Sequence, residues 1–178
     1  MLASASPQRS AILTMLGVSF RIEVPGVEEA DVGDPRELVL ENARRKARAV
    51  VGPTVLGVDT LVALEGGVRG KPGDEEEAAR FLMALSGRTH EVWSGMALRD
   101  ASRERTATAM TRVTFRTLDD SWLSWYLAAG EWRGRAGGYA IQGRGAALVE
   151  RIEGDYWNVV GLPVRELVRL APELVRGS

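Results

Sequence analysis

The order of apolar and polar positions along the chain predicts several β-strands. Residues 55–63 form an apolar, β-branched run that is typical of a buried strand. Residues 20–24, 89–98 and 106–118 alternate between apolar and polar positions, and the charged segment 99–105 joins the last two as a predicted antiparallel hairpin. Short strands are also predicted at residues 1–3 and 147–152.

Helices are predicted where apolar residues recur at helical spacing after a helix-start signal. These segments are residues 7–16, 35–50, 74–85, 119–129 and 163–170. Residues 153–162 are predicted to form a loop. Because helices and strands alternate along the chain, the expected class is α/β or α+β with a mixed sheet.

One predicted helix carries a lysine on its apolar face. Val39, Ala43, Lys46 and Val50 follow helical spacing, so Lys46 lies within the apolar stripe of residues 35–50. Such a lysine either extends along the edge of the core to reach water or projects into a cleft.

The segment from Leu56 to Pro72 is expected to organise the chemistry of the chain. Asp59 and Thr60 interrupt its apolar strand, and a buried carboxylate is costly unless something compensates its charge. Either a partner cancels that charge, or the strand ends at a cleft where Asp59 faces a metal ion or a polar substrate. Lys71, in the following Gly-Lys-Pro turn, is a candidate for the same cleft.

Three further segments carry candidate groups. The Ser-x-Ser-Pro turn that ends at Pro7 places hydroxyls and free backbone N–H groups at a helix start, which either only begins the helix or binds an anion with Ser6 and Arg9. Glu29 lies in a turn with adjacent carboxylates. Residues 130–145 contain six glycines around Gln142, a density that requires tight turns, positive φ angles or close approach to a ligand.

Composition excludes several classes of function. The 178 residues suffice for one domain spanning residues 1–178, and a net charge of −1 argues against broad nucleic-acid binding. The chain has no cysteine, so disulfides, thiolate metal sites and a cysteine nucleophile are excluded. His90 is the only histidine, and we expect it to make a polar contact at the edge of the sheet rather than to act in catalysis.

No signal peptide or membrane-spanning run is recognised in the sequence, so the expected location is the cytoplasm. Lys46 and Lys71 are the only lysines among 23 basic residues, which suggests that a compact ammonium group is needed at these positions.

Familiar catalytic motifs are absent, and what remains is a set of acids and cations. The Gly-Lys-Pro segment lacks the Ser or Thr of a phosphate-binding P-loop, and nothing suggests a Ser-His-Asp triad. Asp59 and Glu29 together with Arg9, Lys46 and Lys71 suit a substrate that carries several negative charges, with Mg²⁺ bridging its oxygens. The residues alone do not indicate which phosphorus is attacked.

The order of short motifs along the chain resembles the Maf family of nucleoside triphosphate pyrophosphatases. The matching segments are LASASPQRSAIL, VEEAD, LGVDTLV, GKP, LSGRTHEVWSGMAL and AGGYAIQGRGAALVERIEGDYWNVVGLPV. The resemblance implies a mixed α/β fold, similar to that of inosine triphosphatases, in which an elongated sheet with flanking helices forms two lobes around a central cleft, often in a homodimer. It also implies hydrolysis of a nucleoside triphosphate to the monophosphate and diphosphate with a divalent cation, Mg²⁺ or Mn²⁺, in the cytoplasm, including removal of non-canonical nucleotides.

The resemblance assigns roles to individual residues. It implies that Asp59 is the proton acceptor and that Glu29 shares the metal with it. Binding of the phosphates falls to Ser6, Arg9, Lys46 and Lys71, and selection of the base to Thr60 and Gln142.

The Ile-Gln-Gly version of the late motif resembles the subfamily that acts on dTTP and UTP. That group carries Arg where this chain has Gln8, a position tied to substrate choice. Loss of this cation is expected to weaken triphosphate binding by about 1–3 kcal/mol if it made a direct charged hydrogen bond. The alternative function is a nucleotide- or nucleic-acid-binding regulator of septum formation with little turnover.

Overall fold

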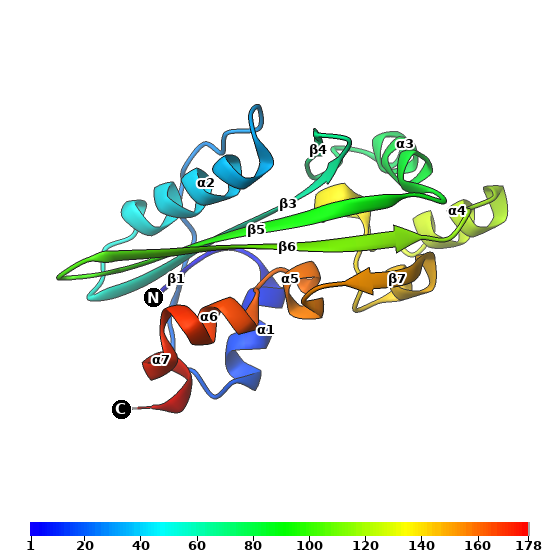
Figure 1. Cartoon of the computed structure of the whole chain (residues 1–178). Coiled ribbons are helices and arrows are strands. Elements are labelled where there is room, and N and C mark those ends of the chain that lie inside the picture. Colours follow the sequence, from blue (N-terminus) through cyan, green and yellow to red (C-terminus); the bar gives the residue numbers. More distant parts are fainter. Residues whose placement is uncertain (178) are drawn as a thin grey trace.

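The computed structural model describes residues 1–177, and its centre is a seven-stranded mixed sheet (Figure 1). The strand order is β2-β1-β3-β5-β6-β7, and β4 pairs with β3 outside this path. β1 runs parallel to both of its neighbours, and the other pairs are antiparallel. The strands are β1 (Leu2–Ala3), β2 (Ile22–Glu23), β3 (Thr54–Leu64), β4 (Gly67–Arg69), β5 (Thr89–Asp100), β6 (Glu104–Phe115) and β7 (Val149–Glu153).

Helices cover both faces of this sheet. They are α1 (Pro7–Met15), α2 (Pro35–Ala49), α3 (Glu75–Leu85), α4 (Asp120–Leu127), α5 (Tyr156–Val160), α6 (Val164–Leu170) and α7 (Pro172–Arg176), with 3₁₀ turns η1 (Ala136–Gly138) and η2 (Arg144–Leu148). Aspartates cap four of the helices by accepting hydrogen bonds from first-turn amides: Asp34, Asp74, Asp119 and Asp155.

The long strands β3, β5 and β6 give the sheet its elongated shape (Figure 1). The predicted hairpin is confirmed, but both strands extend further toward the turn than expected, because the charged segment 99–105 mostly continues the ladder and only residues 101–103 turn. At its other end β6 stops at Phe115, before the predicted residue 118. Asp100 stabilises this turn by accepting hydrogen bonds from the amides of Ser102 and Arg103.

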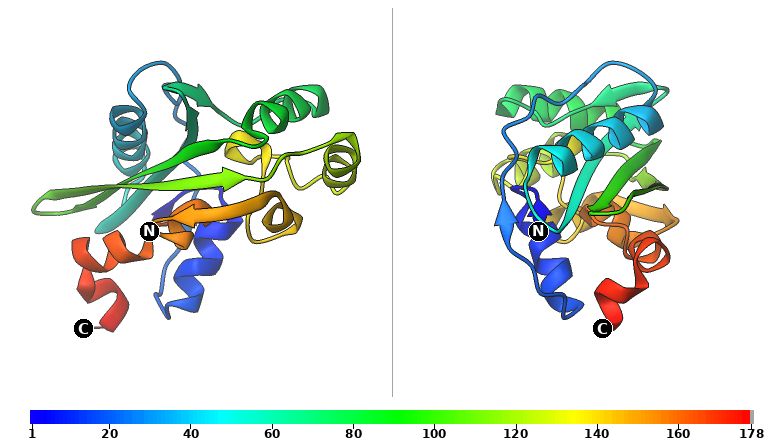
Figure 2. Two further views of the ribbon diagram at one scale, coloured as in Figure 1. Left: turned by 45° about the vertical axis from the view of Figure 1, so that its right-hand side comes forward. Right: turned by 90° about the vertical axis from the view of Figure 1, so that its left-hand side faces the viewer.

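One face of the sheet carries α2, and the other carries α1, α5, α6 and α7 (Figures 1 and 2). On the α2 face the buried contacts are made by small residues such as Ala43 and Ala47. On the opposite face Ile12 and Leu13 of α1 and Leu167 of α6 pack against Leu56 and other apolar residues of β3 and β5.

Two glycines of the sheet let α2 approach unusually closely. A Cβ atom at Gly57 of β3 would overlap the backbone of α2 at Ala43, and one at Gly95 of β5 would overlap it at Val39. Because both positions lack a side chain, the helix backbone rests directly on the sheet. This close approach holds the next turn of the helix, which carries Lys46, beside β3.

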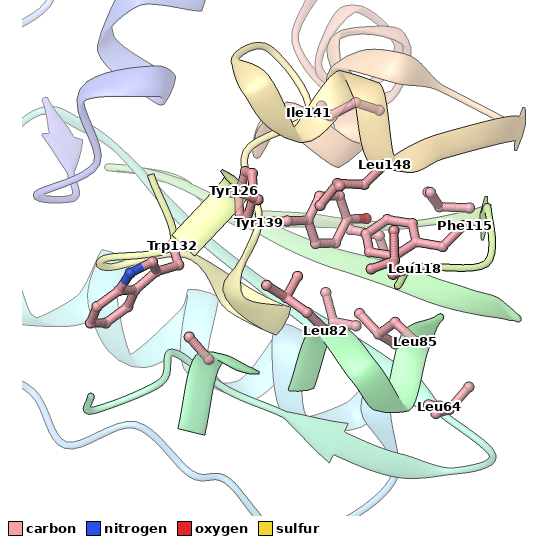
Figure 3. Packing of buried hydrophobic residues seen from close by; sticks show 14 residues of the cluster. Leu64, Leu82, Leu85, Phe115, Leu118, Tyr126, Trp132, Tyr139, Ile141 and Leu148 are labelled. Carbon is pink, nitrogen blue, oxygen red and sulfur yellow. The ribbon is translucent and has the colours of Figure 1, made fainter. Parts of the chain in front are cut away.

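A second cluster fills the far end of the same face that α1 covers. Side chains from α3, α4, β6 and the segment 132–148 meet there (Figure 3). Phe115, Tyr126 and Tyr139 are buried in it, and the hydroxyl of Tyr126 accepts a hydrogen bond from the amide of Ala140. The glycine-rich segment is therefore anchored to α4 rather than being an open loop.

His90 lies inside this cluster, so the expectation of a polar contact at the sheet edge is wrong. It is 1 % exposed, its Nε2 forms a 2.8 Å hydrogen bond with the Tyr139 hydroxyl, and its ring packs edge-on against Phe115. Burial lowers the pKa of His90 to about 4.

Several element boundaries differ from those predicted. The strand expected at residues 20–24 is only Ile22–Glu23, and β7 starts later than expected because η2 occupies its first positions. The segment 153–162 contains the short helix α5, and α7 follows α6 near the end of the chain. None of the helices described within residues 1–177 is long and apolar enough to cross a membrane.

Candidate active site

The candidate active site lies at a gap in one edge of β3. β1 pairs with this strand at Leu56 and Gly57, and β4 pairs with it from Val62 onward. Within the described residues, positions 58–61 are paired only with β5 on the other edge. Since successive side chains of a strand point to opposite faces, Asp59 and Thr60 can both reach a cavity that opens at this gap.

A cavity of about 430 Å³ occupies the gap, between the cluster around α1 and the cluster around α3 and α4. All nine site residues expected from the sequence line it: Ser6, Gln8, Arg9, Glu29, Lys46, Asp59, Thr60, Lys71 and Gln142. They come from positions separated by more than a hundred residues, so the fold alone brings them together.

A lysine bridges two carboxylates at the centre of the cavity. Lys46 Nζ lies 2.6 Å from Asp59 Oδ1 and 2.7 Å from Glu29 Oε1. The side chains of Lys46 and Asp59 are 7 % and 8 % exposed, whereas that of Glu29 is 40 % exposed. Lys46 therefore reaches into the cleft instead of extending along the core edge, and it compensates the buried charge of Asp59.

Asn42 holds the carboxylate of Asp59 and the backbone of the turn that carries Glu29, and it was not identified from the sequence. Its amide donates to Asp59 Oδ2 at 3.1 Å and to the carbonyl of Ala30 at 2.9 Å, while its oxygen accepts from the Ala30 amide at 2.8 Å. Asn42 thus ties the turn that carries Glu29 to α2 and β3. The signal was present, because an asparagine four residues before Lys46 lies on the same helix face.

Arg9 joins three elements around the site. Its Nε donates to the carbonyl of Gly161 at 2.9 Å, Nη1 to Ser4 Oγ at 2.9 Å and Nη2 to Thr60 Oγ1 at 3.1 Å. Burial lowers the pKa of Arg9, and the charges of Asp59 and Glu29 oppose that shift. The guanidinium therefore orients Thr60 while its remaining N–H groups are available to an anion.

The start of α1 has the features of an anion site. Ser6 precedes the helix but does not cap it; its hydroxyl donates to Gln8 Oε1 at 3.1 Å, and its amide donates to Ser4 Oγ. Among the described residues 1–177, no side chain accepts from the first-turn amides of α1, and the residues of this turn line the cavity.

Lys71 and Gln142 lie at the exposed rim of the cavity. Gln142 and Gln8 also border a smaller apolar groove of about 180 Å³ beside α1, which Ile12, Met15 and Trp157 help to line. The two glutamines therefore stand where the polar cavity meets an apolar surface.

Other residues at the cavity were not anticipated. Tyr139, Arg133 and Arg135 form the wall opposite α1. Ser94 does not line the cavity, but its Oγ hydrogen bonds to Thr60 Oγ1 at 2.9 Å. The high glycine content of residues 130–145 signalled an unusual backbone, and it did not single out these side chains.

Comparison with known proteins agrees with the motif pattern. The family model described as "Maf-like protein" matches residues 1–174. A protein of Pelotomaculum thermopropionicum named dTTP/UTP pyrophosphatase is 47 % identical over 174 residues, which cover 93 % of this chain and 91 % of that protein.

Two further relatives carry the same name. The dTTP/UTP pyrophosphatase of Thermus thermophilus is 46 % identical over 95 % of this chain and 91 % of its own length. That of Deinococcus radiodurans is 44 % identical over 95 % of this chain and 89 % of its own length. With a family match along nearly its whole length and relatives at this level of identity, the chain belongs to the Maf family.

Proposed function

We propose that this protein is a nucleoside triphosphate pyrophosphatase that hydrolyses dTTP and UTP to the monophosphate and diphosphate. The observation that carries this proposal is the convergence of the nine site residues on one cavity around the buried Asp59–Lys46 pair. The relatives named dTTP/UTP pyrophosphatase support the reaction and the choice of base.

Asp59 serves as the general base in this proposal. It accepts a proton from a water molecule, the water oxygen bonds to the α-phosphorus, and the bridging oxygen leaves with the diphosphate. Lys46 and Asn42 each hold one carboxylate oxygen of Asp59, so the group is oriented before substrate binds.

The donor set suits a divalent cation that binds together with the substrate. Asp59 and Glu29 are the two acidic residues at the cavity, and no group of three acidic or histidine side chains that could hold a metal occurs in the described part of the chain. Mg²⁺ commonly uses one or two carboxylates plus substrate phosphates, which fits this pair. When bound, such an ion would neutralise charge that develops on the phosphate oxygens.

The remaining residues divide between the phosphates and the nucleoside. Ser6, Arg9, Lys46 and Lys71 supply hydroxyl, guanidinium and ammonium donors for the phosphates. Gln8, Thr60 and Gln142 face the nucleoside, and their amide and hydroxyl groups can discriminate between bases.

A turnover assay in ¹⁸O-labelled water tests the proposal. The protein is incubated with dTTP, UTP, CTP and GTP plus Mg²⁺ or Mn²⁺, and diphosphate is separated from orthophosphate. We expect dTMP and diphosphate from dTTP, with the ¹⁸O label in dTMP, because attack at the α-phosphorus leaves the water oxygen there. Label in the diphosphate would indicate attack at the β-phosphorus.

Asp59→Asn is the matched variant, since it keeps the size of the side chain and removes the base. Its turnover should fall by about 10²–10⁴-fold. Full activity in this variant would remove Asp59 from the role proposed here, and binding of nucleotide without any turnover in the parent protein would favour a regulatory function instead.

A further inference from the structure

Two arginines on the cavity wall opposite α1 have no assigned role. Arg133 and Arg135 line the cavity from the segment that precedes η1, and Lys71 lies at the rim of the same cavity. Among residues 1–177 none of these three side chains takes part in an ion pair or a side-chain hydrogen bond; the only partner of Arg133 is the ring of Trp132, 4.5 Å away.

The other two cations of the cavity already contact protein oxygens, although Arg9 keeps further N–H groups for a phosphate. Lys46 is paired with both Asp59 and Glu29, and Arg9 donates to three protein oxygens. With five cationic side chains and two carboxylates on its walls, the cavity carries an excess of positive charge that lies mainly on Lys71, Arg133 and Arg135.

Arg135 is the least expected of these three residues. It is half-buried, its Nε is enclosed without a hydrogen-bond partner, and burial lowers its pKa. A desolvated guanidinium without an acceptor is costly, so such a group usually has a counter-ion. The charge of the Glu131 carboxylate acts on Arg135, but within residues 1–177 Glu131 forms no ion pair with it, and its Oε2 accepts a hydrogen bond from the Arg144 amide. Glu29, at the cavity itself, is held by Lys46.

A backbone hydrogen bond joins the segments that carry Arg135 and Lys71. The amide of Gly137 donates to the carbonyl of Gly70 at 2.9 Å, which joins the glycine-rich segment to the Gly-Lys-Pro turn. Gly137 also packs so closely on Val62 of β3 that a Cβ atom there would lie 2.8 Å from the valine side chain. Val62 is three residues beyond Asp59, or about 10 Å along the strand.

The cavity therefore has two ends on either side of Asp59. Ser6, Gln8 and Arg9 lie at the end near β1, where the apolar groove begins, and Lys71 and Arg135 lie at the end near β4. A triphosphate with its α-phosphate between Asp59 and the donors of Ser6 and Arg9, and its nucleoside on the groove side of Gln8, would direct its terminal phosphates toward the β4 end.

We propose that Arg135, together with Lys71 and Arg133, binds the diphosphate part of the substrate, which becomes the leaving group. This assignment rests on the proposed function for the identity of the substrate. Neutralising the departing phosphates would favour cleavage, and the planar guanidinium of Arg135 suits two phosphate oxygens at once.

Binding of the two products by Arg135→Gln tests this assignment without requiring turnover. Isothermal titration of the protein with inorganic diphosphate and with dTMP, each with Mg²⁺, gives two dissociation constants. We expect the constant for diphosphate to rise about tenfold or more, as for loss of a charged hydrogen bond, and that for dTMP to stay unchanged. Arg135→Lys should lie between the parent and Arg135→Gln.

The controls separate a binding role from a structural one. Arg165→Gln changes an exposed arginine of α6 away from the cavity and should leave both constants unchanged. Arg133→Gln changes an exposed side chain, so it tests the same end of the cavity with little risk to folding, and it should show a smaller selective loss of diphosphate.

Three results would overturn the assignment: equal weakening of both ligands in Arg135→Gln, no weakening of either, or a parent protein that binds no diphosphate. Its failure is distinct from failure of the proposed function. A parent that binds diphosphate through Arg135 but does not hydrolyse dTTP would refute the function and leave the anion site in place.

Discussion

Lys46 and Asp59 form a buried ion pair, 2.6 Å between Nζ and Oδ1, with more than nine-tenths of each side chain removed from solvent. The same ammonium reaches Glu29, so one lysine holds both carboxylates of the site. Removing one member of a buried pair leaves the other charge without compensation, which costs far more than the pair itself contributes. The site and the stability of the fold are therefore coupled through Lys46.

Lys46→Met should lower the free energy of unfolding by about 3–5 kcal/mol, because it leaves Asp59 charged and buried without its partner. Urea denaturation of the parent and the variant at neutral pH measures this difference. Asp59→Asn should lower the free energy of unfolding by less than Lys46→Met does, since Lys46 keeps its contact with Glu29. The double variant Lys46→Met/Asp59→Asn should be more stable than the sum of the two single effects predicts. Strictly additive effects would show that the two side chains are not coupled.

The stability of the protein should fall as the pH is lowered through the range in which unfolded histidine titrates. The pKa of His90 is about 4 in the folded protein and about 6.5 when unfolded, so the unfolded state binds more protons between these values. The contribution of His90 is fully present above pH 6.5 and is lost as the pH falls to 4, for a total of about 3 kcal/mol. Urea denaturation at pH 7 and pH 5 should show about 2 kcal/mol of this loss.

His90→Gln is the matched variant for this pH dependence. Glutamine can keep the hydrogen bond to Tyr139 but does not titrate. The variant should lose less stability than the parent between pH 7 and pH 5. An identical loss in both proteins would place the origin of the pH dependence in other groups.

The Asn42→Ala variant should need a higher concentration of the divalent cation for its activity. The substitution frees the turn around Ala30 and therefore Glu29, which is expected to raise the Mg²⁺ concentration for half-maximal activity about tenfold. The rate at saturating Mg²⁺ should fall much less than in Asp59→Asn. Leu40→Ala, on the same helix but away from the cavity, provides the control, and an equal effect in both variants would argue against the role given to Asn42.

Gln8→Arg should strengthen binding of the triphosphate. Gln8 borders both the cavity and the apolar groove, so an arginine there would add a cation near the start of α1. We expect the KM for dTTP to fall about tenfold with little change in kcat. A panel of dTTP, UTP, CTP and GTP measured on both proteins also shows whether this position selects the base. Gln8→Met, which keeps the length of the side chain and adds no charge, should not lower the KM.

The site residues could be predicted because their chemistry is unusual for their local setting. Asp59 interrupts an apolar strand, Lys46 interrupts the apolar face of a helix, and both anomalies proved to be one ion pair. Their separation in the sequence hides this pairing, which depends on α2 lying directly on Gly57 and Gly95. Local pattern therefore identified the groups, and tertiary packing determined their partners.

The errors have a similar origin. His90 was expected at an edge because it begins a strand, but the glycine-rich segment covers that end of the sheet and places Tyr139 against it. The helix α5 was missed because its five residues are too few to show a helical period. When a distant segment covers a residue, the local sequence does not show it. A very short helix likewise leaves too few positions for its period to be recognised.

The position of the cavity follows from where two short strands stop. The pairing of β1 with β3 stops at Gly57 and that of β4 begins at Val62, so one edge of β3 is left unpaired for only a few residues. A strand that also paired with residues 58–61 on this edge would complete the hydrogen-bond ladder and would close the opening. Access to Asp59 therefore depends on an interruption of the pairing along one edge of β3, and the width of the opening follows from the short lengths of β1 and β4.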